Sequence, residues 1–239
     1  MSISTGPVRP PTDFQEALSK PLILASASPR RRDIMRQAGL PFVVRTSAAE
    51  QELDTATGRQ TQDASGIDTA DNTAACFALK AARLKAVDVA GDCPGRLVIG
   101  ADTVVSVDSY LLGKPIDDSD AVRMLRLLSG RSHQVITALV IAYSDGSTVR
   151  LASEDYVTSV VVFRPLNDRE IYQYVESGEP MDKAGAYAIQ GLGGSLVDRI
   201  EGSYLNIVGL PVDKLVAMLH TLGWSLQEAK ESQPSDEVH

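Results

Sequence analysis

The sequence predicts an α/β protein with a mixed β-sheet. Short apolar runs alternate with segments of helical period, which is typical of α/β folds; they lie at 21–25, 97–100, 104–107 and 135–142. A turn at Asp145-Gly146 separates two β-prone runs, 132–143 and 148–163, and this arrangement predicts a long hairpin. Because parallel strands and an antiparallel hairpin must coexist, we expect the sheet to be mixed.

The chain is long enough to bury a real core. It has 239 residues, of which 44% are hydrophobic, and we expect one domain over residues 20–226. Residues 1–19 begin with a proline-rich, weakly apolar stretch, and residues 227–239 are polar throughout. Both ends are therefore expected to be flexible tails.

Composition narrows the classes of partner. The net charge of −8 and an aromatic content of 5% argue against a nucleic-acid-binding module, which needs a basic field and stacking rings. Cys76 and Cys93 match no redox or zinc motif, and no stretch approaches the ~20 apolar residues of a membrane span. We expect a soluble cytoplasmic protein without a membrane or nucleic-acid partner, although one pocket for a small anion stays compatible with the acidic charge.

The first strand, at 21–25, leads into an unusual turn. In the sequence LILASASPRRR, Ser28 suits a helix N-cap and Pro29 the first helical turn, and three arginines follow. A helix N-terminus at the carboxyl end of a strand is a common anion site, and arginine adds bidentate donors for phosphate. Successive helical positions differ by about 100°, so at most two of these arginines can face one ligand. The alternative is a simple capped turn with solvated arginines.

Later helices have readable ends. Asn167 with Glu170 three residues later resembles a capping box, and Gly178 suits the helix end. Further helices are expected at 73–87, 119–128 and 211–222, and a polar loop is expected at 54–72. The glycine cluster QGLGG at 190–194 matches no nucleotide-binding motif, so we interpret it as a turn leading to a strand.

One carboxylate stands out inside an apolar run. Asp102 interrupts LVIGADTVV, and burial of an unpaired carboxylate costs several kcal/mol. Asp102 should therefore meet a metal, a cation or a water that it deprotonates, unless it only caps a turn. With three histidines in the chain, a metal site is expected to use oxygen ligands. By themselves, Lys80 on a helix and Lys114 in the turn GKP fit ordinary surface lysines.

Six motifs in order carry a family resemblance. LILASASPRRR, GADTVV, GKP, LSGRSHQVIT, SGEPMDKAGAYAIQGLGG and IEGSYLNIVGLP resemble the Maf family of nucleoside triphosphate pyrophosphatases, over residues 21–222. The resemblance implies a twisted mixed sheet with helices on both sides and a central nucleotide cleft. It also implies a divalent cation, Mg²⁺ or Mn²⁺, a homodimer, and hydrolysis of the α–β phosphoanhydride to a nucleoside monophosphate and pyrophosphate.

The resemblance also implies roles for individual residues. Asp102 would accept the proton of the attacking water and contact the metal. The substrate-binding residues would be Ser26, Arg30, Arg31, Lys80, Lys114 and Lys183. For the second metal ligand, SAAEQE departs from the family's Ser-x-[IV]-Asp-Glu element. Glu50 is the expected ligand, with Glu52 as the alternative.

Three positions bear on the choice of base. Arg30, Thr103 and Gln190 match the branch that resembles dTTP/UTP pyrophosphatases, so we expect a pyrimidine triphosphate, ordinary or modified. The 7-methyl-GTP branch tends to have a tryptophan after Ser-Pro and a glutamate in place of the glutamine. That branch is one alternative, and a non-catalytic nucleotide-binding regulator of cell division is the other.

Overall fold

The computed structural model describes residues 12–47, 70–108 and 110–231. Seven strands form one twisted sheet in the order β2-β1-β3-β5-β6-β7, with β4 paired to β3. The strands are β1 (Leu22–Leu24), β2 (Phe42–Val44), β3 (Leu97–Val107), β4 (Tyr110–Leu112), β5 (Ser132–Ser144), β6 (Val149–Phe163) and β7 (Val197–Glu201). Strand β1 pairs in parallel with β2 and β3, and the other pairings are antiparallel. The predicted mixed α/β sheet is confirmed.

The long hairpin is the centre of the sheet. Strands β5 and β6 pair from Ser132↔Val162 to Ser144↔Val149, so the Asp145-Gly146 turn lies where the sequence predicted it. The two expected apolar runs at 97–100 and 104–107 form one continuous strand, β3, which passes through Asp102. The carboxylate therefore interrupts the apolar pattern without interrupting the strand.

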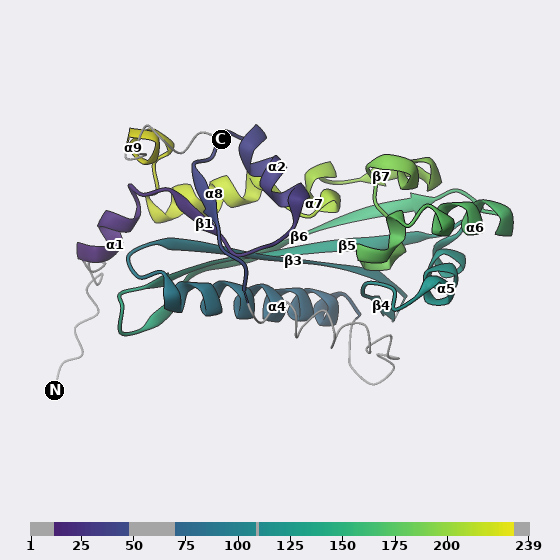
Figure 1. The fold of residues 1–239 in the computed structure, drawn as a ribbon, viewed down its shortest axis with the longest axis horizontal. Coiled ribbons are helices and arrows are strands. Elements are labelled where there is room, and N and C mark those ends of the chain that lie inside the picture. The colour runs from purple at the N-terminus through teal and green to yellow at the C-terminus, as the bar shows by residue number, and fades with distance from the viewer. Residues whose placement is uncertain (1–11, 48–69, 109, 232–239) are drawn as a thin grey trace.

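Helices cover both faces of the sheet (Figure 1). Helix α4 (Ala70–Asp92) lies along one face, and α2 (Pro29–Gln37), α7 (Tyr204–Val208) and α8 (Val212–Leu222) lie on the other. The alternation along β3 explains the two layers: Leu97 and Ile99 join the core under α8, and Val98 joins the core under α4. Alanines form the sheet-facing side of α4, at positions 74, 78, 82 and 86.

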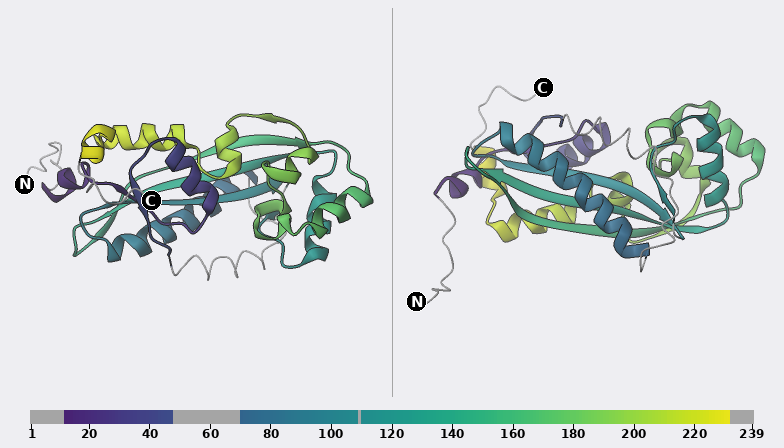
Figure 2. Two further views of the ribbon diagram at one scale, coloured as in Figure 1. Left: turned by 45° about the horizontal axis from the view of Figure 1, so that its top comes forward. Right: turned by 90° about the horizontal axis from the view of Figure 1, so that it is seen from below.

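A third apolar cluster lies at the far end of the hairpin, where α5 (Asp118–Leu128) and α6 (Asp168–Glu176) pack side by side (Figure 2). Helix α6 begins with the predicted capping box, in which Asn167 and Glu170 exchange hydrogen bonds. Three short 3₁₀ helices follow it, namely η1 (Glu179–Asp182), η2 (Ala184–Ala186) and η3 (Gly191–Leu196). The QGLGG cluster is thus a helical turn that leads into β7, as expected.

Two short helices lie within the segments that composition predicted to be tails. Helix α1 (Thr12–Ala17) occupies part of the expected N-terminal tail, and Ala17 and Leu18 are buried in the core. Helix α9 (Leu226–Glu231) occupies part of the expected C-terminal tail and buries Ala229. Each segment is short, so its few apolar residues do not give a visible period. The rest of both tails and most of the expected loop at 54–72 lie outside the described residues.

Helix α4 is longer than the expected 73–87, since it runs from Ala70 to Asp92. None of the helices in the described part of the chain combines the length and the apolar character that a bilayer span requires.

Candidate active site

A cavity of about 670 Å³ opens beside the middle of β3, within the usual range for small-molecule sites. On this edge, β3 pairs with β1 at Val98 and Ile99 and with β4 from Val105 to Val107. Among the described strands, none pairs with this edge between those two positions. The gap exposes Asp102 and Thr103, and the carboxyl end of β1 delivers the N-terminus of α2 to the same place.

The cavity is basic, and we call it the basic pocket. Its described lining contains five basic and two acidic side chains, namely Arg30, Arg31, Lys85, Lys114, Lys183, Asp102 and Asp182. The chain as a whole carries a net charge of −8. A local excess of positive charge on an acidic protein is suited to one small polyanion and unsuited to a long nucleic acid.

Asp102 has a lysine partner. The Nζ of Lys85 donates to Oδ1 of Asp102 over 2.8 Å, and the two side chains are 5% and 18% exposed. Gly100 makes this approach possible, because a Cβ there would overlap the carbonyl oxygen of Ala82 and lie 2.8 Å from the Cβ of Ala86. The expectation that Asp102 meets a cation, a metal or a water is answered in part: it meets a cation.

Arg31 is held in a fixed direction by three acceptors. Its Nε donates to the carbonyl of Gly209 (2.9 Å), its Nη1 to Oγ of Ser26 (3.0 Å) and its Nη2 to Oγ1 of Thr103 (3.2 Å). The guanidinium is thus a buried positive charge in the pocket wall that joins α2, β3 and the end of α7. Ser28 occupies the N-cap, as predicted, but its side chain makes no capping hydrogen bond to the described residues of α2.

Thr103 continues this network into the core. Its Oγ1 lies 2.9 Å from Oγ1 of Thr137, and the hydroxyl of Thr137 donates to the carbonyl of Asn206 over 2.9 Å. Since Thr137 has one hydroxyl proton, Thr103 must be the donor of the pair. The Thr103 hydroxyl can therefore offer only acceptor capacity to other groups, and Arg31 is one group that uses it.

The opposite rim comes from the 3₁₀ segments. Lys183 donates to the carbonyl of Glu179 over 2.8 Å and forms an ion pair with Asp182. Burial would raise the pKa of the Asp182 carboxyl, but the hydrogen bond and charge of Lys183, together with the charge of Arg30, hold that pKa below its usual value. Asp182 is therefore ionised at neutral pH and offsets part of the positive charge at this rim.

Most residues that the sequence singled out meet in this pocket. Asp102, Thr103, Arg30, Arg31, Lys114, Lys183 and Gln190 all line it. Arg32 does not, which agrees with the expectation that at most two of the three arginines face one ligand.

Two expected substrate-binding residues lie elsewhere. Ser26 is fully buried and is not part of the lining. Its hydroxyl accepts a hydrogen bond from Arg31. Lys80 is exposed on α4 and is not part of the described lining of the pocket. Lys85, on the same helix, lines the pocket instead. The two lysines are five positions apart, about 140° around the helix axis at about 100° per residue. The alanine spacing could have identified Lys85, because it directly precedes Ala86 in the sheet-facing stripe.

The described residues offer a partial set of metal ligands. They contain no group of three or more His, Cys, Asp or Glu side chains that could hold an ion, and Glu50 and Glu52 lie outside the described residues. Asp102 supplies one carboxylate facing the pocket. That donor fits a hard cation such as Mg²⁺, which typically binds through one or two carboxylates and the phosphates of a substrate.

Comparison with known proteins identifies the family of the chain. The family model described as Maf-like protein matches residues 21–222. A dTTP/UTP pyrophosphatase of Symbiobacterium thermophilum is 45% identical over 86% of this chain and 95% of its own length. The corresponding values are 46%, 84% and 96% for the dTTP/UTP pyrophosphatase of Geobacter sulfurreducens, and 40%, 87% and 100% for that of Dictyoglomus thermophilum. With the family match, this level of identity over nearly whole chains shows that the protein belongs to the Maf-like family.

Proposed function

We propose that this protein is a nucleoside triphosphate pyrophosphatase that hydrolyses dTTP and UTP to the nucleoside monophosphate and pyrophosphate. The relatives described above carry this activity in their names. The structural observation that carries the proposal is the pairing of Asp102 with Lys85 inside a pocket whose other charged residues are mainly basic.

The pocket supplies the two things that phosphoanhydride hydrolysis needs. Positive charge must stabilise the phosphate oxygens as the bond to the leaving group breaks; Arg30, Arg31, Lys114 and Lys183 line the pocket and provide it. A base must also orient a water molecule and take its proton. Asp102 is the carboxylate at the β3 edge that can do so, and Lys85 holds it in place.

The proposed step is a displacement at the α-phosphorus. The water oxygen forms the new bond to phosphorus, and its proton passes to Asp102. The bond between the α-phosphorus and the bridging oxygen breaks, and pyrophosphate leaves with that electron pair. The cationic side chains stay fixed, so that positioning and electrostatics supply most of the rate.

A divalent cation, Mg²⁺ or Mn²⁺, is proposed as the cofactor, with Asp102 and Glu50 as its protein ligands. When bound, it would neutralise phosphate charge and help to orient the substrate. Asp102 would keep its hydrogen bond from Lys85 while its carboxylate helps to hold the ion.

Further proposals concern the setting of the reaction. We place the protein in the cytoplasm, in keeping with two cysteines that form no disulfide with each other. One domain over residues 20–226 stays a prediction from length and composition. A homodimer and roles for Arg30, Thr103 and Gln190 in base selection stay predictions based on the family resemblance. Light scattering of the purified chain measures the assembly directly.

The deciding experiment is a panel of triphosphates. Purified protein with Mg²⁺ is offered dTTP, UTP, CTP, ATP, GTP, 7-methyl-GTP and modified pyrimidine triphosphates, and both monophosphate and pyrophosphate are quantified. Preferential release of pyrophosphate from dTTP and UTP supports the proposal. Preference for 7-methyl-GTP moves the protein to the other branch, and binding without turnover makes it a nucleotide-binding regulator.

A further inference from the structure

The glycine turn at the pocket rim is built around a carboxylate of the protein itself. Glu179 accepts hydrogen bonds from the backbone N–H of Leu192 (3.0 Å, to Oε2) and of Gly193 (2.9 Å, to Oε1). Consecutive N–H groups in such a turn make an anion-binding concavity. Here Glu179 fills it, so these two N–H groups are not available to a phosphate.

Tyr174 extends the contact to the other side of Gln190. Its hydroxyl donates to Oε1 of Glu179 (2.9 Å) and accepts from the backbone N–H of Ala188 (3.2 Å). Ala188 lies two residues before Gln190, and Leu192 lies two residues after it. The Tyr174–Glu179 pair is thus hydrogen-bonded to the backbone on both sides of Gln190, and Gln190 itself lines the pocket.

The glycines are explained by this close approach. A Cβ at Gly191 would lie 2.6 Å from Oε2 of Glu179, and Gly191 also has a positive φ of 78°. A Cβ at Gly193 would lie 2.5 Å from the hydroxyl of Tyr174. A Cβ at Gly193 would also overlap the carbonyl oxygen of Ala188, and a Cβ at Gly194 would lie 2.7 Å from that of Ile189. The glycine pattern therefore serves close packing of the turn against Tyr174, Glu179 and the backbone that precedes it.

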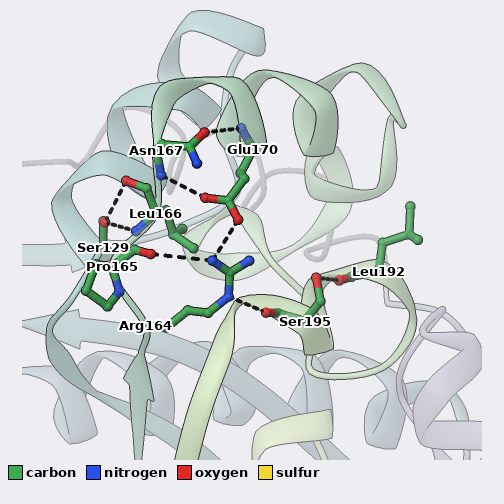
Figure 3. A network of polar contacts seen from close by, with 8 residues as sticks. All are labelled: Ser129, Arg164, Pro165, Leu166, Asn167, Glu170, Leu192 and Ser195. Carbon is green, nitrogen blue, oxygen red and sulfur yellow. Dashed lines mark hydrogen bonds and ion pairs between the residues drawn. The ribbon is translucent and has the colours of Figure 1, made fainter.

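The far end of the turn is anchored separately (Figure 3). Arg164, at the end of β6, donates to the carbonyl of Ser195 over 2.8 Å and pairs with Glu170 over 2.7 Å, while Ser195 donates to the carbonyl of Leu192 over 2.7 Å. Arg164 thus holds the far end of the turn, and the Tyr174–Glu179 pair holds the end next to Gln190.

Glu179 is charged in this setting. Burial acts to raise the pKa of its carboxyl, but the N–H groups of Gly193 and Leu192, with the Tyr174 hydroxyl and the Lys183 charge, hold that pKa below its usual value. The amide of Glu179→Gln would offer the same two N–H groups only one acceptor oxygen. Whichever terminal atom of a glutamine is the NH₂ group, it would face a backbone N–H.

We propose that Glu179, together with Tyr174, is a positioning residue for base selection, which holds Gln190 at the pocket rim where it meets the base of a pyrimidine triphosphate. The inference rests on the proposed function, because base selection presupposes a nucleotide substrate. It assigns to Glu179 no contact with the phosphates and no part in proton transfer.

The first test needs no substrate. Amide hydrogen exchange of residues 188–193 is compared among wild type, Glu179→Gln, Tyr174→Phe and the control Glu176→Gln, which removes an exposed carboxylate at the end of α6. Both Glu179→Gln and Tyr174→Phe should accelerate exchange in this segment, and Glu176→Gln should not. Wild-type protection in both folded variants would overturn the proposal, whatever the protein hydrolyses.

The second test is kinetic. Glu179→Gln should lower kcat/KM for UTP and dTTP about tenfold through KM, the effect expected for a lost charged hydrogen bond, while kcat stays within about twofold. Discrimination against GTP should fall in parallel. In a Gln190→Ala background, Glu179→Gln should have little further effect on discrimination, because both act through the same side chain.

Other kinetic results would contradict the proposed role of Glu179. A drop in kcat at unchanged KM, or a full additional loss on top of Gln190→Ala, would assign Glu179 to another role. If wild type binds UTP without hydrolysing it, the proposed function fails, and the same comparison is made on UTP dissociation constants. Unchanged affinity in Glu179→Gln would then overturn the inference as well.

Discussion

Lys85 and Asp102 join helix α4 to strand β3 at the wall of the basic pocket, with Nζ and Oδ1 2.8 Å apart. The two residues are 17 positions apart in the chain, and their contact depends on how closely α4 lies on the sheet. A salt bridge that is 5% and 18% exposed on its two sides fixes the direction of the carboxylate proposed to act on water.

Replacement of Lys85 separates its role from that of Lys80. Lys85→Met should lower kcat on the order of 100-fold, because the carboxylate of Asp102 loses the group that orients it. Lys80→Met removes the same charge from an exposed position on the same helix and should leave turnover near wild type. Pyrophosphate release under saturating UTP measures both variants. Equal losses in the two would contradict the assignment of Lys85 to the site.

Asp102→Asn tests the proposed base. The amide keeps the size of the side chain but cannot accept a proton from water, so turnover should fall at least about 100-fold while UTP still binds. Turnover is followed by pyrophosphate release, and binding by calorimetry. Near-wild-type turnover in a folded variant would remove Asp102 from this role.

Two glycines test the close approach of α4 to the sheet. Gly100 lies on β3 against α4, and Gly91 lies within α4 itself. Gly100→Ala should lower the free energy of unfolding by about 1–3 kcal/mol, because its Cβ would press on Ala82 and Ala86. Activity should fall with it as Lys85 moves away from Asp102. A Cβ at Gly91 would meet no atom of the described residues within 4 Å beyond its own stretch of helix. Gly91→Ala should therefore raise the free energy of unfolding by about 0.5–1 kcal/mol, because alanine is the better helix former. Urea unfolding compares the two, and a harmless Gly100→Ala would contradict the packing argument.

Thr103 is expected to act through Arg31. Thr103→Val removes the hydroxyl that accepts from Arg31 and donates to Thr137, so it should cost about 1–3 kcal/mol of stability and raise KM for UTP. Thr103→Ser keeps the hydroxyl and should retain most of the affinity. The comparison of KM values is decisive: if valine and serine behave alike, the hydroxyl network does not orient Arg31.

The buried His133 should lower the free energy of unfolding in acid. Burial lowers its pKa to about 4, against the weaker opposing effect of the Arg131 backbone. The unfolded chain takes up a proton near the ordinary pKa of about 6.5, so stability is lost as pH falls from about 6.5 towards 4. Between pH 7 and pH 5 this group should cost about 2 kcal/mol.

The measurement compares urea unfolding of wild type and His133→Gln at both pH values. The variant lacks the titrating ring, and its loss on acidification should be smaller by that amount. An imidazole titration followed by NMR checks the same point in the unaltered protein. A His133 pKa near 6.5 in the folded state would refute the prediction.

Local signals in the sequence predicted much of the fold. The capping box of Asn167 and Glu170, the turn at Asp145-Gly146 and the N-cap position of Ser28 all lie where expected. Each depends on residues within a few positions of one another, so a linear pattern contains the information. The family motifs then identified the pocket residues of β3 and α2.

Only the tertiary structure decided which of several similar residues lie in the pocket. The sequence offered Lys80, and the structure brings Lys85 to Asp102; it offered Ser26 for phosphate, and the structure gives Ser26 to Arg31. Arg31 also bonds to Gly209, 178 positions away in the chain. Such contacts arise from the close approach of α4 at Gly100 and from the packing of distant segments. The alanine spacing of α4 indicates which side of the helix meets the sheet, but no linear pattern encodes the distances from that side to Asp102 or Arg31, because they are set by how whole elements fit together in space.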